Sequence, residues 1–316
     1  MRIQILGSAA GGRFPQWNCS CGNCSAIREN VRENARKNKF SGKARTQSQL
    51  ALSADGSTWF LAGASPDLAF QIESSPQLHP RPLRDTPRDS PIAGVVLGSA
   101  GLDHVAGLLL LRELQPLRVY AAPSILRILR EENSMFGMLN RVDPQVVWTP
   151  MKSDAPFPLL CADGKDSGLR CEVHYLSGRY PKYVQTQAKD LARDEATAAL
   201  FFESSSGKRV AYVPAVGSLS DVLLEKIARA DVLLFDGTFW SDDELQRVQG
   251  SGETAHQMGH VPVQESLRLL RSIKIGRKMF IHLNNTNPIL NEASPEHQAV
   301  RQAGWEVAED NWQLEL

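Results

Sequence analysis

The sequence has no surplus of charge of either sign, because its 35 lysine and arginine residues balance its 35 aspartate and glutamate residues. Such a chain has no net field to attract nucleic acid or an anionic membrane surface, so we expect a small or peptide-like ligand. The sequence also lacks an apolar run near the roughly 18 residues that a membrane-spanning helix requires. Residues 1–7 enter a strand-like segment without the apolar core of a signal peptide, which predicts a cytoplasmic protein.

Cysteine is scarce, and three of the five cysteines are crowded into one segment, at Cys19, Cys21 and Cys24. In a reducing compartment this usage favours metal-bound thiolates over disulfides. The C-x-C-x2-C spacing can place three thiolates around one tetrahedral ion at sulfur–zinc distances near ~2.3 Å. We therefore predict a structural zinc ion, with three free buried thiols as the alternative. The fourth ligand is either water or a residue from far along the chain.

Residues 95–114 form the central segment of the predicted site, and the other segments with candidate functional residues are best interpreted as parts built around it. It begins as an apolar, β-branched run of strand length, and from Val105 its apolar positions recur at helical spacing. Residues 99–104 therefore form a turn at the carboxyl end of a buried strand, where ligands bind in open α/β proteins. Asp103 offers a hard oxygen ligand and His104 a nitrogen ligand. The alternative is that Asp103 only caps the helix and His104 is a polar neighbour.

The second half of the chain repeats this pattern of a polar side chain after a buried strand. Residues 231–240 contain a strand that ends on Asp236, and residues 278–283 are expected to be the last buried strand, ending at His282. An asparagine-rich turn follows, and part of it needs no functional explanation because such turns satisfy their own backbone. The histidine at the strand end does need one.

Two successive strand-rich halves with helices between them predict an α/β fold of two sheets packed face to face with helices outside, in a single domain over residues 1–316. Four candidate catalytic residues could then converge from separate loops on one cleft: Asp103, His104, Asp236 and His282. Carboxylate and imidazole ligands with open positions suit zinc, iron or manganese, and they include the facial triad of non-haem iron oxygenases. A metal ion at this cleft would position and activate water or dioxygen.

Residues 99–104, Ser-Ala-Gly-Leu-Asp-His, align with the H-x-H-x-D-H motif of the metallo-β-lactamase superfamily, which this chain resembles. Over its whole length the chain more closely resembles one family of that superfamily, coenzyme PQQ synthesis protein B. The cysteine segment and the His-x-Asn-Asn-Thr-Asn-Pro segment are the specific matches. The matching segments run from end to end of the chain: residues 4–12, 14–24, 44–48, 64–68, 102–104, 236–238, 258–260 and 281–290.

This resemblance implies a metallo-β-lactamase-like αββα sandwich of two mixed β-sheets with outer helices. It implies a structural zinc ion on Cys19, Cys21 and Cys24, and a role in the biosynthesis of pyrroloquinoline quinone (PQQ). The implied reaction is an Fe²⁺-dependent hydroxylation of the tyrosine ring of a glutamate–tyrosine conjugate that is cut from a precursor peptide. An older suggestion for the family is export of the cofactor or its precursor, which the lack of a membrane span makes hard to support as direct transport.

The sequence departs from the superfamily pattern at three positions. Ser99 and Gly101 stand where the first two histidines of the motif are usual, and Pro214 stands where hydrolytic relatives carry a bridging aspartate. A two-metal hydrolase needs both ions about 3.5 to 4 Å apart in a full ligand set. This sequence lacks that set.

The ligands that remain predict a single-metal site of Asp103, His104 and His282, with Asp236 as a further ligand or as a partner of the ligands. The role of His260 stays open: it either caps the following helix or lies near the metal, where relatives place a histidine. The eroded motif leaves two alternatives to a hydroxylase: a carrier or transport protein for PQQ or its precursor, and a divergent metal-dependent hydrolase. The expected partner is a small peptide-derived PQQ precursor, and the oligomeric state stays open, a homodimer included.

Overall fold

The computed structural model describes residues 1–32, 40–81, 86–142, 145–153, 155–184 and 190–316. The chain divides into two compact units, each assembled from separate pieces of sequence. The first unit contains Met1–Leu6, Gln49–Arg209 and Asn311–Leu316, and the second contains Gly7–Ser48 and Val210–Asp310. The units therefore do not follow the two successive halves that the sequence suggested, because both ends of the chain belong to the first unit. The single domain over residues 1–316 stays a prediction.

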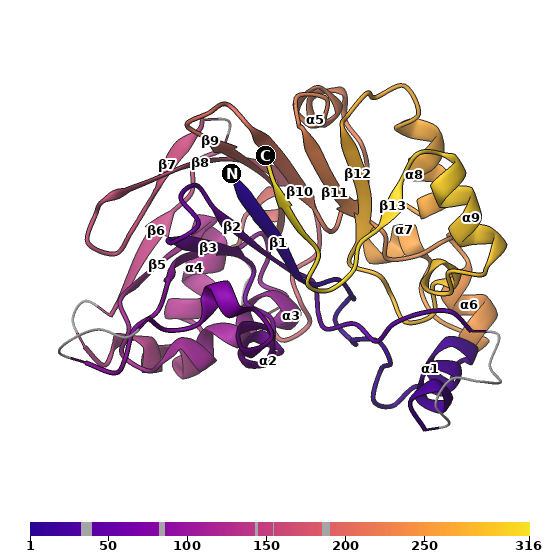
Figure 1. Cartoon of the computed structure of the whole chain (residues 1–316), viewed down its shortest axis with the longest axis horizontal. Helices are drawn as coiled ribbons and strands as arrows, with labels where there is room; N and C mark the ends of the chain where they lie inside the picture. Colours follow the sequence, from indigo (N-terminus) through magenta and orange to yellow (C-terminus); the bar gives the residue numbers. More distant parts are fainter. Residues whose placement is uncertain (33–39, 82–85, 143–144, 154, 185–189) are drawn as a thin grey trace. The chain divides into compact units, whose positions relative to one another are not determined.

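A seven-stranded mixed sheet belongs to the first unit, with the strand order β14-β1-β2-β3-β4-β5-β6 (Figure 1). Its strands are β1 (Arg2–Gly7), β2 (Gln49–Ser53), β3 (Trp59–Ala62), β4 (Ile92–Val96), β5 (Leu117–Ala121), β6 (Val146–Pro150) and β14 (Gln313–Glu315). Strand β1 pairs antiparallel with β14 and β2 with β3, whereas β3 to β6 are parallel. Val95 and Val96 in β4 are fully buried, which confirms the strand predicted from the apolar, β-branched run.

The helix after β4 begins earlier than the sequence suggested. Helix α3 (Leu102–Val105) continues as a 3₁₀ segment, Ala106–Leu111, so His104 lies inside the helix rather than in the turn before it. Gly101 is the N-cap residue, and no side chain makes a capping hydrogen bond there. Asp103 therefore lies in the first turn of the helix and is not its N-cap residue.

An apolar core holds the rest of the first unit together. Besides the seven-stranded sheet and α3, the first unit contains α2 (Leu68–Glu73) and α4 (Pro123–Arg130). It also contains three strands joined in antiparallel pairs, β7 (Phe157–Leu160), β8 (Asp166–Leu176) and β9 (Thr197–Ser204). Leu61, Val119 and Ile125 are among its fully buried side chains. Removal of such aliphatic surface from water is the main favourable term in folding.

The second unit contains four parallel strands, β10 (Arg209–Val213), β11 (Val232–Asp236), β12 (Arg277–Ile281) and β13 (Glu306–Val307), paired in that order. Every residue of β11 is buried, as expected for a parallel strand that is covered on both faces. Strand β12 ends one residue before His282. It is the last buried strand, as expected, because the short strands β13 and β14 that follow it are only partly buried or exposed.

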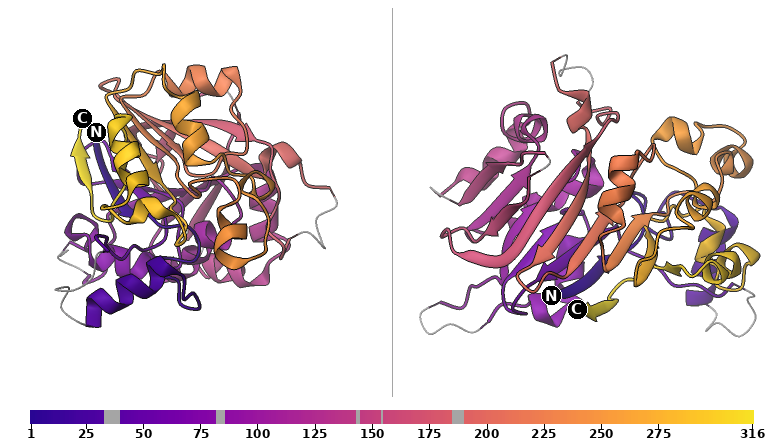
Figure 2. Two further views of the ribbon diagram at one scale, coloured as in Figure 1. Left: turned by 90° about the vertical axis from the view of Figure 1, so that its right-hand side faces the viewer. Right: turned by 90° about the horizontal axis from the view of Figure 1, so that it is seen from above.

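Helices with polar caps accompany these strands. The helices of the second unit are α1 (Gly22–Arg32), α5 (Asp221–Ile227), α6 (Glu244–Gln249), α7 (Ala255–Met258), α8 (Val263–Leu269) and α9 (Pro295–Gln302). Ser220, Thr254 and Ser294 each accept a backbone hydrogen bond at the start of a helix. Figures 1 and 2 show α8 and α9 beside β12 and β13. In the part of the chain that the structure describes, every helix is too short or too polar to cross a membrane.

A buried polar cluster fixes the loop after β1 in the second unit. Asp310 accepts hydrogen bonds from the hydroxyl of Ser8 (2.7 Å) and from both the backbone N–H and the hydroxyl of Thr46 (2.7 and 2.8 Å). The Arg45 guanidinium donates to the Ser8 hydroxyl (3.0 Å), so Ser8 bridges the buried cation to the carboxylate. The loop matters for the site below, because the backbone oxygen of Ser8 accepts a hydrogen bond from the N–H of Leu283.

Replacement of Asp310 by alanine should destabilise the protein by about 2 to 4 kcal/mol, because it removes the strongest of the opposing charges near the buried Arg45 cation. Urea unfolding measures this loss. Glu309→Ala is the matched control, since Glu309 is a half-exposed neighbour whose side chain pairs with Lys43 at the surface. Equal stability of the two variants would contradict the role given to Asp310.

Candidate functional site

Asp103 and His104 lie next to each other in the first unit, at the start of α3. His104 is only 8% exposed, and its backbone oxygen accepts a hydrogen bond from Ala64 (2.7 Å). The carboxylate of Asp103 is 3.6 Å from Nε2 of His104. The two side chains that the sequence singled out therefore present an oxygen and a nitrogen donor to a common region.

Gly101 leaves room for the Asp103 carboxylate at this turn. A Cβ atom at Gly101 would lie 2.7 Å from Oδ1 of Asp103 and 3.3 Å from the ring of His104. Such a short contact requires a neighbour to move. The space that a larger residue 101 would need is thus taken by the Asp103 carboxylate.

Asp236 is the central acceptor of the second unit, at the carboxyl end of β11. It is fully buried and accepts four hydrogen bonds. Oδ1 accepts from the backbone N–H and the hydroxyl of Thr238 (3.0 and 2.7 Å), and Oδ2 accepts from the N–H of Val216 (3.0 Å) and from Nδ1 of His260 (2.8 Å). Burial on its own raises the pKa of a carboxyl group, but His260 and these hydrogen bonds outweigh it and lower the pKa of Asp236. Asp236 is therefore an ionised acceptor with its oxygens occupied.

Two histidines share the hydroxyl of Thr238. Oγ1 of Thr238 is 2.9 Å from Nδ1 of His282 and 3.1 Å from Nδ1 of His260. The two rings are stacked, with centroids 5.7 Å apart and planes 23° apart. Both imidazoles thus turn their Nδ1 atoms toward the buried Asp236 and Thr238, which leaves each Nε2 atom on the opposite edge of its ring.

His282 is held in an uncommon backbone conformation. Its φ angle is +61°, in the left-handed region that a residue with a side chain rarely adopts. The flanking backbone is fixed by hydrogen bonds from Gly237 N–H to Ile281 and from Leu283 N–H to Ser8. Gly237 permits this close approach, since a Cβ there would lie 2.8 Å from the side chains of Phe280 and Leu283.

The structure brings Asp236, His260 and His282 together, with donor atoms within 4.8 Å of one another. Asp103 and His104 belong to the first unit, and their convergence with His282 on one ion stays a prediction. The capping alternative for His260 is wrong, because its ring contacts Asp236 and Pro262 is the N-cap residue of α8. Thr238 was not among the predicted site residues, although an Asp-x-Thr triplet after a buried strand was the available signal.

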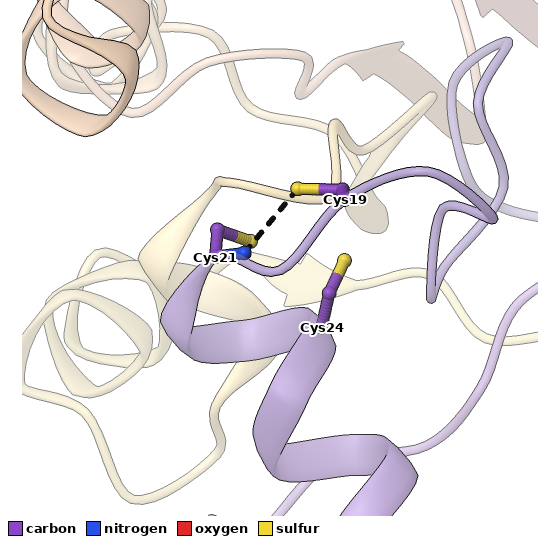
Figure 3. A group of neighbouring side chains, drawn as sticks. All are labelled: Cys19, Cys21 and Cys24. Carbon is purple, nitrogen blue, oxygen red and sulfur yellow. Dashed lines mark hydrogen bonds between the residues drawn. The ribbon is translucent and has the colours of Figure 1, made fainter.

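Cys19, Cys21 and Cys24 point their sulfur atoms toward one another at the start of α1 (Figure 3). The three sulfur atoms lie within 4.8 Å of one another. Burial raises the pKa of Cys24 to about 12, whereas hydrogen bonds from the neighbouring residues overcome burial and lower the pKa of Cys19. A soft cation beside these sulfur atoms would offset the cost of ionising a buried thiol.

Asn285 occupies the position that the sequence could not assign. Its side-chain amide lies 3.1, 3.5 and 3.4 Å from the sulfur atoms of Cys19, Cys21 and Cys24. An amide nitrogen has two hydrogens and cannot donate to three sulfur atoms at once. The reversed amide would present its oxygen to a cation held by the thiolates, so the donor set fits a three-thiolate zinc site with Asn285 as the fourth ligand.

The asparagine-rich turn is also fixed from its other side, by Glu244 at the start of α6. The Glu244 carboxyl group is 2% exposed and contacts the hydroxyl of Thr286 (2.5 Å) and the N–H of Trp240 (2.6 Å). Burial raises the pKa of Glu244 to about 7. Asn287 satisfies the turn itself, as expected, by accepting from the N–H of Ile289 (3.0 Å).

Comparisons with known proteins show the family to which the chain belongs. Residues 58–283 match the family model of the β-lactamase superfamily domain. Coenzyme PQQ synthesis protein B of Methylobacterium radiotolerans is 39% identical to the chain, and that of Rhodopseudomonas palustris is 38% identical, each over the full length of both proteins. The chain belongs to the coenzyme PQQ synthesis protein B family. Among solved structures, zinc-bound PqqB from Methylobacterium extorquens is 38% identical and superposes with a TM-score of 0.87 over the whole of both chains.

The predicted fold is confirmed, since two mixed β-sheets with helices match the metallo-β-lactamase fold of this family. A diphosphatase of the PhnP family superposes with a TM-score of 0.66 at 17% identity, covering 100% of this chain and 97% of that one. At that identity the likeness shows a shared fold and says nothing about the reaction.

The raised pKa of Glu244 predicts a specific dependence of stability on pH. The folded protein keeps the Glu244 proton between the ordinary pKa of 4.5 and about 7, while the unfolded chain releases it. The folded state binds more protons in that window, so this group makes stability fall as pH rises through it.

Glu244→Gln should reduce the fall in unfolding free energy between about pH 5 and about pH 8 by about 1 to 3 kcal/mol, because glutamine does not titrate. The amide oxygen can accept from Trp240 and the amide hydrogens can donate to Thr286, so the local contacts are kept. Urea unfolding of wild type and variant at about pH 5 and about pH 8 measures the difference. Glu225→Gln, a change at an exposed glutamate of the same unit, is the control. If the unfolding free energy of Glu244→Gln depended on pH as in wild type, Glu244 would not be the group responsible.

Proposed function

We propose that this protein acts in the biosynthesis of PQQ by hydroxylating the tyrosine ring of a small glutamate–tyrosine precursor in an iron-dependent reaction. The observation that carries the proposal is the full-length identity of 38 to 39% to coenzyme PQQ synthesis protein B. The buried Asp236–Thr238 pair, which orients two imidazoles, supports a metal-dependent reaction. Oriented imidazoles with carboxylate partners are the usual surroundings of metal ligands.

The cysteine cluster is proposed to hold a structural zinc ion. Cys19, Cys21 and Cys24 would supply thiolates, and Asn285 would supply an oxygen. Zinc is the ion that such a soft, tetrahedral donor set favours. In this role the ion ties the start of α1 to the turn that follows His282.

The catalytic ion is proposed to bind Asp103, His104 and His282. Fe²⁺ bound to such a nitrogen and oxygen set would supply the activation of dioxygen. Asp236 is assigned to positioning rather than to coordination, because its two oxygens already accept four hydrogen bonds. Its work is to keep His260 and, through Thr238, His282 in fixed orientations.

The two alternatives lead to different outcomes in the same assay. A two-metal hydrolase is disfavoured, because the proline at 214 offers no side-chain ligand where a bridging carboxylate is needed. A carrier of PQQ or its precursor would need no metal ligands at all. The cytoplasmic location and the oligomeric state stay predictions.

The hydroxylation is tested by anaerobic loading of the purified protein with Fe²⁺, followed by the glutamate–tyrosine dipeptide and ¹⁸O-labelled dioxygen. We expect a ring-hydroxylated dipeptide that carries the label. His282→Ala should lose activity by about 100-fold or more. His256→Ala, a change at an exposed histidine of the same unit, should keep it.

An iron-loaded wild type that makes no hydroxylated product would contradict the reaction. Turnover of phosphodiesters or lactams with zinc or manganese would favour the hydrolase instead. Tight binding of PQQ that survives both His104→Ala and His282→Ala would favour the carrier.

The zinc site is tested by elemental analysis of protein that is purified without chelators. Cys21→Ser should lose about one equivalent of zinc per chain, since two thiolates and an amide bind zinc poorly. Cys161→Ser is the control, because Cys161 belongs to the other unit and is not one of the clustered thiols. Equal zinc content in the two variants would show that the cluster is not a zinc site.

A further inference from the structure

We propose that Thr238 is a positioning residue that selects the tautomer of His282, so that Nε2 and not Nδ1 is the atom available to a metal ion. This inference rests on the proposed role of His282 as a ligand, but it concerns the protein before any ion or substrate binds. The decisive feature is the place of Thr238 Oγ1 between one carboxylate and two imidazoles.

The proton inventory of the cluster leaves one consistent assignment. Both oxygens of Asp236 already accept backbone N–H groups, from Thr238 (Oδ1, 3.0 Å) and Val216 (Oδ2, 3.0 Å), so the carboxylate acts as an acceptor. The hydroxyl of Thr238, 2.7 Å from Oδ1, therefore donates its single hydrogen there. Oγ1 of Thr238 can then only accept, and its neighbour at 2.9 Å is Nδ1 of His282. His282 must therefore carry its proton on Nδ1.

His260 is fixed by the same logic through a different acceptor. Its Nδ1 atom is 2.8 Å from Oδ2 of Asp236, which can only accept, so His260 also carries its proton on Nδ1. The two histidines thus share a tautomer, but Nδ1 of His260 has the Asp236 carboxylate as a partner in addition to the Thr238 hydroxyl at 3.1 Å. Removal of the Thr238 hydroxyl should release His282 and leave His260 bound to the carboxylate.

The Thr238 oxygen also excludes the other placement of an ion. It lies 2.7 to 3.1 Å from Asp236 Oδ1 and from the Nδ1 atoms of His260 and His282. It therefore occupies the space in which an ion bound by those atoms would sit. A metal ion that uses His282 is directed to the Nε2 edge of the ring.

The main chain holds Thr238 in this place. Its side chain is buried, with the residue 3% exposed, and its backbone oxygen accepts a hydrogen bond from the N–H of Asn284 (3.0 Å). The side-chain amide of Asn287 donates to the backbone oxygen of Gly237, one residue before (2.8 Å). The hydroxyl thus has little freedom to leave Asp236.

The test compares Thr238→Val, Thr238→Ser and Thr46→Val. Thr46 is the matched control, because it is also buried in the second unit and its hydroxyl donates to a buried carboxylate, Asp310, at 2.8 Å. Loss of either hydroxyl leaves a buried carboxylate with one hydrogen bond fewer, so the stability losses should be similar. Only Thr238→Val should change the state of His282.

The primary readout is ¹⁵N NMR of the histidine rings in metal-free protein, at a pH where the spectra show neutral rings. We expect the Nδ1–H tautomer of His282 in wild type, Thr238→Ser and Thr46→Val, and a mixture of tautomers in Thr238→Val. The second readout is the affinity for an added zinc ion, measured by chelator competition with the thiolate site already filled. Thr238→Val should weaken it by about 10- to 100-fold, and Thr46→Val should not.

An Nε2–H tautomer of His282 in wild type would overturn the proposal, even if Thr238→Val fails to fold. So would a Thr238→Val protein with the wild-type tautomer and zinc affinity. Neither result depends on the hydroxylation assay. Failure of the proposed reaction and failure of this inference are therefore distinguishable.

Discussion

The hydrogen bonding of one buried carboxylate, Asp236, is the interaction on which the site depends. A fully buried ionised carboxyl group is tolerated only when its charge is paired and its oxygens are satisfied. Here four donors do this, and each belongs to a segment that must be in place: Val216 after β10, Thr238 after β11, and His260 between α7 and α8. Satisfying this buried charge therefore fixes the three loops that supply the donors. Thr238 also contacts His282 after β12, so the orientation of His282 depends on the same carboxylate.

The turn after His282 links this carboxylate cluster to the cysteine cluster. Asn285, three residues further on, lies against the sulfur atoms of Cys19, Cys21 and Cys24. Asn23 of α1 also donates to the backbone oxygens of Asn285 and Asn287 (3.1 and 2.9 Å). A zinc ion at the thiolates would hold a turn whose first residue is in a strained backbone conformation. This gives the distant cysteine motif a physical connection to the imidazole of His282.

Much of this architecture could be predicted from the sequence, because strand and metal-ligand patterns are local. The thiol cluster, the strand ending on Asp236 and the histidine after the next strand are all spaced recognisably along the chain. Two kinds of feature could not be predicted. The short strands β13 and β14 take their place from partners far away in sequence, and Asn285 and Thr238 acquire their roles only through side chains from other segments. A threonine or an asparagine in a turn has many ordinary explanations, so only its neighbours in space reveal its role.

The central proposal is that His282 presents Nε2 to a catalytic ion and that Asp103 and His104 are the other protein ligands of this ion. A crystal structure of the iron-loaded protein, grown without oxygen and measured at the iron absorption edge, tests it most directly. We expect an anomalous peak at about 2.0 to 2.2 Å from Nε2 of His282, with Asp103 and His104 as the other protein ligands and Asp236 uncoordinated. A peak bonded to Asp236 and to the Nδ1 atoms of His260 and His282, with Thr238 displaced, would contradict it.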